Sequence, residues 1–386
     1  MENKKIVIFI ILALIVVSII FVAFFNKNDS ESPLIQETEN VGDIIVPPIT
    51  DYEGDENWSE AITKIKDIDS DKEVYFTESC KAEPLSNLSG TIYLSLVPQN
   101  SDKMGIYGID VDTGAISDFL VDDSKSYYGI NFSNDGSMIS FVSKDENGSS
   151  VMIASANGKN IRRVTKESSD HIINPQIYDN NSKVLFSRSE YPAPNIPESS
   201  KIYSSDLNGN EVFLTEGNNP LLSPDEKKML FMKVAGIYLF DMETLEQKRV
   251  IELRDAEGEI IFNKLMSKAR ISQDKSKLIV SYAGPGENSL YSFEIISWSP
   301  FQYRLKAVIN QPSFFWEAFS PDSNYVAVQA GDIVFSDKFL DGKKVSYFES
   351  QNTRLAIFDT CNFDEVKSFD LEKKFNLIDM FVDFWR

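Results

Sequence analysis

The sequence contains only one histidine, His171. A metal site built from several histidines is therefore excluded. The chain also lacks a Gly-x-Ser-x-Gly motif, so a Ser-His-Asp triad would depend on His171 alone. We expect His171 to be an ordinary surface or strand residue. The sequence predicts no catalytic residues, no metal ligands and no cofactor.

Basic residues are few relative to acidic ones. Lysine and arginine together number 38, against 59 aspartates and glutamates, and the formal net charge is −21. Nucleic acid is excluded as a partner, since phosphate binding requires a basic face. The acidity is expected to keep a tethered β-protein soluble; the alternative is a surface that attracts cations or a basic partner.

The N-terminal segment contains twenty residues, 6–25, without charge, glycine or proline. Such a run is long enough to cross a membrane as a helix. Lys4 and Lys5 precede it, so the positive-inside rule places residues 1–5 in the cytoplasm and the rest of the chain outside, in a periplasmic or extracellular location. The alternative is a cleaved signal peptide, although no small-residue cleavage site closes the run. We predict a single-pass signal anchor.

Two shorter segments follow the apolar run. Residues 26–56 are polar and acidic, with three prolines, and predict a flexible linker. Residues 57–68 carry apolar side chains at helical spacing, which predicts a short amphipathic helix. This helix would pack on the edge of the next domain or bind a partner.

From residue 130 onward one phrase recurs: an apolar residue, a turn built on Asp or Asn, and an alternating strand. The five copies are 132–136, 178–182, 222–226, 271–275 and 319–323. Their marker residues are 45, 45, 49 and 48 residues apart, a period typical of four-stranded propeller blades. Gly136 suits a turn with positive φ. Glu226, Lys275 and Ser323 replace it in other copies, so those turns must differ in geometry or carry mild strain.

A second phrase of the type Ile-Tyr-x-x-Asp lies between the first ones. Its six copies are 106–110, 151–155, 202–206, 237–241, 290–294 and 355–359. Turn residues and another strand usually follow, which makes a second hairpin in each period. A degenerate first-phrase copy at 88–94 raises that count to six. We predict an all-β, six-bladed propeller of four-stranded antiparallel blades over residues 72–386; seven blades are the alternative.

With these residues the chain resembles the TolB-like propeller family. The family's blade pattern is an apolar-Ser-Pro-Asp-Gly turn followed by an Ile-Tyr-x-x-Asp hairpin, and 132–165 and 202–233 match it best. The resemblance covers about residues 85–370 and includes no attached peptidase domain. It implies a fold, whereas function varies among the members.

Two further sequence features bear on a disulfide and on a calcium site. Cys80 and Cys361 flank the repeats, so a closed ring would bring them together, and we expect a disulfide; two unrelated thiols are the alternative. The stretches 110–118 and 206–209 have oxygen ligands at alternate positions, as calcium loops do. The same pattern is favoured by hairpin turns, and we therefore predict no metal.

Both repeated turns should lie at one end of the blades, which leaves the longer connections for the other end. These are 191–197, 252–268, 283–287 and 331–352. Long loops on a rigid scaffold commonly carry binding sites. The candidate partner-binding rim is Tyr191, Ile196, Phe335, Phe339, Tyr347 and Phe348. A hairpin packed on its own blade is the alternative for 331–352.

The predicted function is a membrane-anchored, exported, non-catalytic propeller that binds a protein, peptide or glycan at the cell envelope. The alternative is an enzyme that acts on envelope or extracellular polymers through carboxylates in the central channel. A close carboxylate pair in a deep pocket would favour the enzyme, and an aromatic-rich rim would favour binding.

Overall fold

The computed structural model describes residues 74–76, 88–189, 200–233, 236–252, 265–284, 287–310, 314–340, 343–361, 363–372 and 374–386. The chain divides into two units, 1–46 and 47–386, and every described residue belongs to the second. The predicted anchor, linker and helix, 6–25, 26–56 and 57–68, lie outside the described residues. Within the described part of the chain, no helix is long and apolar enough to cross a membrane.

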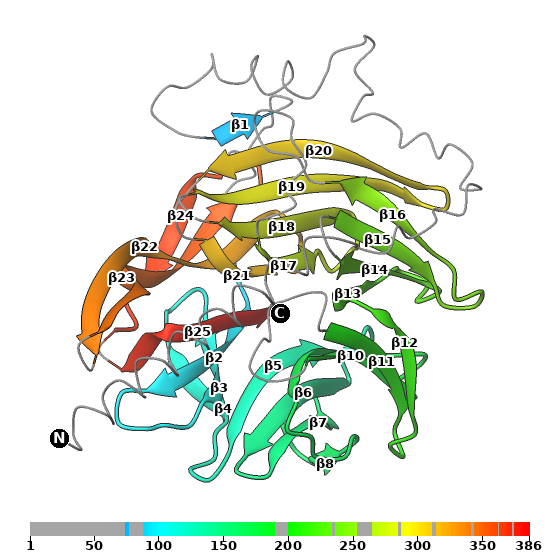
Figure 1. The fold of residues 1–386 in the computed structure, drawn as a ribbon, viewed down its shortest axis with the longest axis horizontal. Helices are drawn as coiled ribbons and strands as arrows, with labels where there is room; N and C mark the ends of the chain where they lie inside the picture. Colours follow the sequence, from blue (N-terminus) through cyan, green and yellow to red (C-terminus); the bar gives the residue numbers. More distant parts are fainter. Residues whose placement is uncertain are drawn as a thin grey trace, which may run out of the picture. The chain divides into compact units, whose positions relative to one another are not determined.

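Six antiparallel sheets form the blades of a propeller, which confirms the predicted blade number (Figure 1). For each blade, the strands are given below in spatial order from the central channel outward. Blade 1 is β25 (Phe375–Trp385), β2 (Thr91–Pro98), β3 (Gly105–Asp110) and β4 (Ile116–Leu120). Blade 2 is β5 (Ser126–Phe132), β6 (Met138–Asp145), β7 (Gly148–Ser155) and β8 (Arg162–Arg163). Blade 3 is β9 (His171–Tyr178), β10 (Lys183–Ser189), β11 (Ser200–Asp206) and β12 (Glu211–Glu216).

The other three blades follow in chain order. Blade 4 is β13 (Asn218–Leu222), β14 (Lys228–Lys233), β15 (Gly236–Asp241) and β16 (Gln247–Glu252). Blade 5 is β17 (Leu265–Ile271), β18 (Lys277–Gly284), β19 (Glu287–Trp298) and β20 (Phe301–Asn310), with β1 (Val74–Phe76) added to β20 as a fifth strand. Blade 6 is β21 (Phe314–Phe319), β22 (Tyr325–Leu340), β23 (Lys343–Asp359) and β24 (Glu365–Phe369).

The core lies between the blades, in six apolar clusters that each join two neighbours. Strand β14 shows how the sequence produces this arrangement. Met229 and Phe231 pack toward blade 3, and the alternating Leu230 and Met232 pack toward blade 5. Because successive side chains point to opposite faces, a strand covered on both faces is apolar along its length. Each fully buried side chain of this size contributes about 1.5–3 kcal/mol.

Each repeated first-phrase turn is held by two hydrogen bonds of one serine hydroxyl, an arrangement that we call the serine bracket. In blade 6 the Ser320 hydroxyl donates to Asp322 Oδ1 at 2.6 Å and accepts the N–H of Tyr325 at 2.9 Å. Ser133, Ser223 and Ser272 make the same pair of bonds. The bracket closes the chain on itself and fixes the hairpin.

The replacements for Gly136 use the same turn geometry. Gly136 has φ 67°, and Glu226, Lys275 and Ser323 have φ 58°, 60° and 60°. Non-glycine residues pay a steric penalty in this left-handed region. Of the two expectations stated for these turns, a different geometry is therefore wrong and mild strain is confirmed.

The ring closes in blade 1, where the two innermost strands come from opposite ends of the propeller and no first-phrase turn joins them. The C-terminal strand β25 pairs with β2, and Thr91 and Arg386 exchange backbone hydrogen bonds of 2.6 and 2.9 Å. The indole N–H of Trp385 also donates to Ser89 O at 3.0 Å. The degenerate copy at 88–94 is thus not a turn between consecutive strands. It is the place where the two ends of the propeller meet.

Candidate functional site

The two ends of the blades differ, as the sequence predicted. Backbone hydrogen bonds of 2.6–2.9 Å join second-phrase turns to first-phrase turns, for example from Ala156 N to Ser137 O and from Thr360 N to Asn324 O. We call this end the turn face. The opposite end, the loop face, carries the connections between the second and third strands of each blade and the entries into the next inner strands.

A cavity of about 310 Å³ opens at the loop face, at the mouth of the central channel. Five of the six inner strands contribute to its wall: β5, β9, β13, β17 and β25. Its lining residues are Val97, Asp102, Met104, Ser126, Tyr128, Gly129, Lys144, His171, Ile173, Asn174, Asn218, Asn219, Lys268, Phe381 and Asp383. We refer to it as the channel cavity. A space with apolar walls and a few convergent polar groups is typical of a small-ligand site.

Three inner strands bend into the cavity at the same place. Gly129, Asn174 and Asn219 have φ of 70°, 51° and 54°, and the pairing of each strand with its neighbour shifts beside them. Glycine and asparagine are the residues that tolerate positive φ best. These bulges redirect the local side chains toward the channel axis.

Hydrogen bonds then tie the inner strands to one another. The Asn174 amide donates to Asn219 Oδ1, and the Asn219 amide donates to Ala269 O at 2.6 Å. Arg270 continues the series, with Nε donating to Glu317 O at 3.0 Å. On the other side of the ring, Ser95 donates to Asp383. Gly129 N donates to Ser95 Oγ at 3.2 Å and Asn131 Nδ2 donates to Pro175 O at 3.0 Å, so hydrogen bonds link the inner strands from β25 round to β21. We call this series the amide belt.

Two cations and two carboxylates are buried beneath the cavity. Lys268, Arg270, Glu317 and Asp383 are exposed by 4%, 8%, 0% and 4%. Lys268 and Asp383 line the channel cavity, and Asp383 and Arg270 line a smaller cavity of about 80 Å³ nearer the turn face. The cluster thus separates the two ends of the channel.

Burial governs the pKa values in this cluster. It lowers the pKa of Lys268 and raises those of Glu317 and Asp383, because a low-dielectric site disfavours charge. The opposite charges of the cluster oppose each of these shifts. Formally the four charges cancel, so the floor of the cavity carries no net charge.

An aromatic pair forms part of the wall. The rings of Tyr128 and His171 are stacked, with centroids 5.9 Å apart and planes at 12°. Burial lowers the pKa of His171 to about 4, with a further contribution from Lys144, so the imidazole is neutral at pH 7. Burial also raises the pKa of Tyr128 to about 12, which the nearby Ser149 hydroxyl opposes. Both groups are uncharged at neutral pH.

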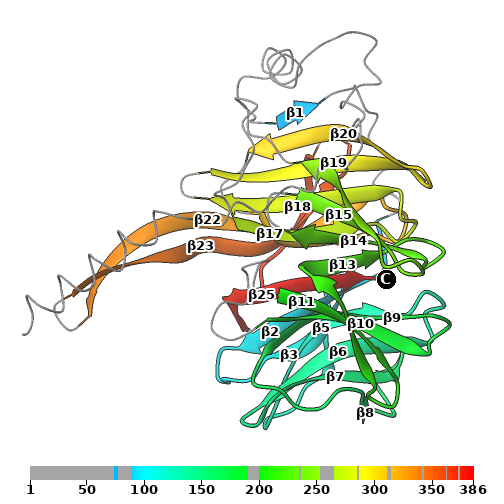
Figure 2. The same ribbon diagram turned by 45° about the vertical axis from the view of Figure 1, so that its right-hand side comes forward.

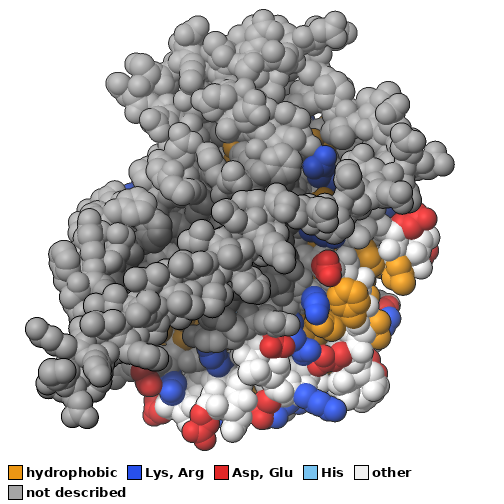
Figure 3. Space-filling view, in the orientation of Figure 1, with side chains coloured by type: hydrophobic (Ala, Val, Ile, Leu, Met, Phe, Trp, Pro, Cys, Tyr) orange, Lys and Arg blue, Asp and Glu red, His pale blue; other side chains and the backbone are white. Residues whose placement is uncertain are grey.

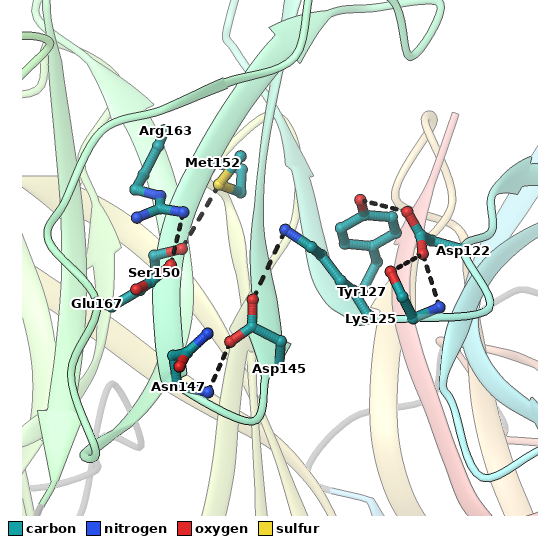
Figure 4. A network of polar contacts seen from close by, with 10 residues as sticks. Asp122, Lys125, Tyr127, Asp145, Asn147, Ser150, Met152, Arg163 and Glu167 are labelled. Atoms are coloured by element: carbon teal, nitrogen blue, oxygen red, sulfur yellow. Dashed lines mark hydrogen bonds and ion pairs between the residues drawn. The ribbon is translucent and has the colours of Figure 1, made fainter.

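Two short loops support the rim beside blade 2 (Figure 4). Asp122 accepts hydrogen bonds from the backbone and hydroxyl of Ser124 at 2.8 and 2.6 Å. Lys125 Nζ lies 3.6 Å from Asp145 Oδ2, which links this loop to the β6–β7 turn. Ser126 and Lys144, which line the cavity, are the adjacent residues. The rim is therefore fixed by local polar contacts.

The predicted rim residues are only partly placed. Tyr191 and Ile196 lie outside the described residues. The segment 331–352 is a paired hairpin that continues β22 and β23, and Phe335 pairs with Phe348. Figure 2 shows this hairpin extending beyond the neighbouring blades at the loop face. The hairpin form was one of the two expectations; a binding role for Phe335, Phe339, Tyr347 and Phe348 stays a prediction.

Other sequence predictions have mixed outcomes. His171 lies on a strand, as expected, but it also lines the channel cavity. Lys268, placed in a connection by the sequence, is a strand residue of β17 because that strand begins at Leu265. Asp110 accepts two bonds from Thr113, at 2.8 and 2.7 Å, in a hairpin turn. The described residues contain no cluster of three or more metal-ligating side chains.

Of the two cysteines in the predicted disulfide, Cys361 lies among the described residues. Cys361 follows β23, and its N–H donates to Asp359 Oδ1 at 2.9 Å. No described cysteine is a free thiol. Cys80 lies outside the described residues, so its pairing with Cys361 stays a prediction.

Sequence reasoning missed the buried cluster and the amide belt. A signal was present, because Gly129, Asn174 and Asn219 follow one another at the same 45-residue spacing as the turn markers. Aligning the copies on those markers would have placed all three on inner strands. No comparable signal brings Asp383 to Lys268, because that approach depends on closure of the ring.

One face of the described residues can be followed in a space-filling view. Over the part of the molecule coloured in Figure 3, acidic, basic and apolar side chains are interspersed.

Solved structures show the same fold. TolB from Acinetobacter baumannii is 15% identical with a TM-score of 0.50; the match covers 72% of this chain and 62% of that protein. Hydrazine synthase from Kuenenia stuttgartiensis is 13% identical with a TM-score of 0.53, over 75% of this chain and 46% of that one. An oligogalacturonate lyase in complex with manganese is a weaker match, from which no conclusion is drawn: it is 10% identical with a TM-score of 0.45, over 70% of this chain and 77% of that one.

No family model and no curated protein matches the sequence. The likeness to the TolB structure, together with the six sheets described above, therefore confirms the TolB-like six-bladed propeller fold and nothing finer.

Proposed function

We propose that this protein is an exported, membrane-anchored binding module whose site is the channel cavity and its rim on the loop face. Residues 6–25 would anchor it and residues 26–56 would tether the propeller outside the cytoplasmic membrane. The partner is a protein, peptide or glycan of the cell envelope. The observation that carries the proposal is the cavity itself, which is built by five inner strands and is closed beneath by buried charges.

The arrangement of the carboxylates favours binding over catalysis. Asp383 accepts the Ser95 hydroxyl, and Arg270 and Lys268 oppose the burial-induced rise in its pKa. Glu317 is fully buried and does not line either described cavity. A glycoside hydrolase needs two carboxylates that flank a substrate bond. Glu317 and Asp383 instead balance the charges of the buried cations Lys268 and Arg270.

Site-specific photo-crosslinking in native membranes tests the proposal. A photoreactive residue at Lys144, an exposed residue of the rim, should capture the partner from the full-length chain. The matched control is Lys159, an exposed lysine at the turn face of the same blade. Capture from Lys159 alone would place recognition on the turn face and contradict the proposal.

Blocking the mouth gives a second readout. Asp102 is an exposed residue of the cavity rim, so Asp102→Trp should obstruct the entrance without altering the core. Its control is Asp112→Trp, which removes the same charge on the turn face. Capture should fall with the first and persist with the second. Replacing 333–350 by a Gly-Ser linker then tests whether the hairpin adds contacts.

Topology is tested separately. Protease added to intact cells, or to spheroplasts if an outer membrane exists, should digest residues 60–386. Protection of this region together with a cytoplasmic control would show that the orientation is wrong.

A further inference from the structure

Two buried polar groups of the channel cavity lack hydrogen bonds of normal geometry to the described residues. Asn218 is the first residue of β13 and is 5% exposed, and its Oδ1 has no partner within the described part of the chain. The Tyr128 hydroxyl of β5 lies near the Ser149 hydroxyl but makes no hydrogen bond of normal geometry to a described residue. Native proteins satisfy nearly all such groups, and an exception calls for an explanation. A bound ligand that supplies the missing hydrogen-bond partners is one such explanation.

The two groups define the complement they need. Asn218 Oδ1 can only accept a hydrogen bond, whereas the Tyr128 hydroxyl can donate and accept. Hydroxyl groups of a ligand match both, since a ligand O–H can donate to the amide oxygen and a ligand hydroxyl oxygen can accept from the phenol. A carboxylate has no proton to give to Asn218.

The charges around the cavity disfavour an ionic ligand. Lys144 at the rim and Lys268 at the floor oppose an ammonium group, and Asp383 opposes a carboxylate. The two carboxylates of the buried cluster already match its two cations. A neutral ligand leaves this balance intact, whereas a charged one disturbs it in a low-dielectric site.

The lining and the volume of the channel cavity narrow the class of ligand further. Ile173, Phe381 and Val97 supply apolar surface, and the stacked Tyr128 and His171 rings add an aromatic edge. Apolar surface beside hydroxyl-binding groups suits a sugar ring, which presents C–H and O–H groups together. At about 310 Å³ the cavity is near the lower limit for ligand pockets. Because the buried cluster closes its floor, an occupant enters from the loop face and ends there.

We infer that the channel cavity binds the end of a neutral saccharide, with Asn218 and Tyr128 as the hydroxyl-recognising residues. This inference rests on the proposed function and specifies its ligand. A polysaccharide would insert its terminal unit into the cavity, and the rest of the chain would lie along the loop face.

Saturation-transfer NMR on the full-length protein in detergent tests the inference. The probes are D-glucose, D-galactose and N-acetyl-D-glucosamine, compared with D-glucosamine, D-glucuronate and the tripeptide Ala-Ala-Ala. At least one neutral sugar should bind, about tenfold or more tightly than its charged counterpart. If a charged sugar binds equally well, or if no neutral sugar binds, the inference is wrong.

Two variants locate the binding. Tyr128→Phe removes one hydroxyl, and Asn218→Leu removes the amide; each should weaken sugar binding about three- to tenfold, the loss expected for one hydrogen bond. The control is Tyr178→Phe, whose hydroxyl bonds Ser204 at 2.6 Å near the turn face, and it should bind sugar normally. If melting shows that Asn218→Leu is unfolded, Tyr128→Phe decides. Unchanged binding in Tyr128→Phe overturns the assignment.

The outcomes separate this inference from the proposed function. If Ala-Ala-Ala binds and the sugars do not, the ligand is a peptide: the saccharide inference fails and the site remains. If crosslinking from Lys144 captures a partner while no probe binds, the binding role stands without the ligand class. If the partner is captured only from Lys159, the proposed site itself is wrong.

Discussion

The turn face and the channel are built by opposite rules. On the turn face, four blades repeat one serine bracket and one left-handed residue, even where that residue is Glu226 or Lys275. In the channel, inner strands contribute different side chains, including amides, a lysine, an arginine and two carboxylates. Repetition marks what every blade needs in order to fold. Departure from repetition marks where the molecule is specialised.

The largest effect is expected in the buried cluster. Lys268→Met removes one cation and leaves Glu317 and Asp383 undercompensated, so the free energy of unfolding should fall by about 3–5 kcal/mol. The double variant Lys268→Met/Glu317→Leu removes one charge of each sign and should recover much of the loss. Urea denaturation measures both. A single variant as stable as the parent would mean that the cluster is not tightly coupled.

A disulfide between Cys80 and Cys361 should contribute the next largest amount. It would close a loop of roughly 280 residues, for which chain entropy allows at most about 5–6 kcal/mol; we expect about 3 kcal/mol after native strain. Non-reducing peptide mapping should recover the linked pair, and Cys80→Ser, Cys361→Ser and the double variant should be equally destabilised. Two freely alkylatable thiols in protein from its own compartment would contradict the bond.

Protonation of His171 should make the channel sensitive to acid. Its pKa is lowered from 6.5 to about 4 in the folded protein, so the unfolded chain binds the proton first. Stability is therefore complete above about pH 6.5 and is lost as the pH falls toward 4, by about 3 kcal/mol for this group. His171→Phe keeps a ring against Tyr128 and should flatten the dependence. Denaturation at pH 7 and pH 4.5 compares the two, and parallel curves would refute the assignment.

The turn face should give the smallest effect per site because each serine bracket holds only one turn. Ser320→Ala removes the bonds to Asp322 and Tyr325 and should cost about 1–2 kcal/mol, as the loss of a helix cap does. Ser133→Ala and Ser272→Ala should cost similar amounts. The exposed Ser299→Ala serves as the control and should be neutral. Strongly unequal losses would show that the brackets are not equivalent.

Much of the fold could be predicted because its determinants are local. The Ser-x-Asp turns, the alternating strands and the 45- to 49-residue period lie within single blades, and they specify six blades and a turn face. The candidate site could be predicted only as a face. Long connections pointed to the loop end, whereas the cavity itself is lined by inner-strand residues such as Asn218 and Tyr128.

The sequence by itself determined the blade, since turn chemistry and period-2 alternation act over a few residues. Only the tertiary structure decided the channel. Ser95 bonds Asp383 across 288 positions, and Arg270 bonds Asn174 at 3.4 Å across 96. Such contacts depend on β25 closing the ring and on bulges that turn side chains inward. Both are consequences of six sheets packing around one axis, which no single blade encodes.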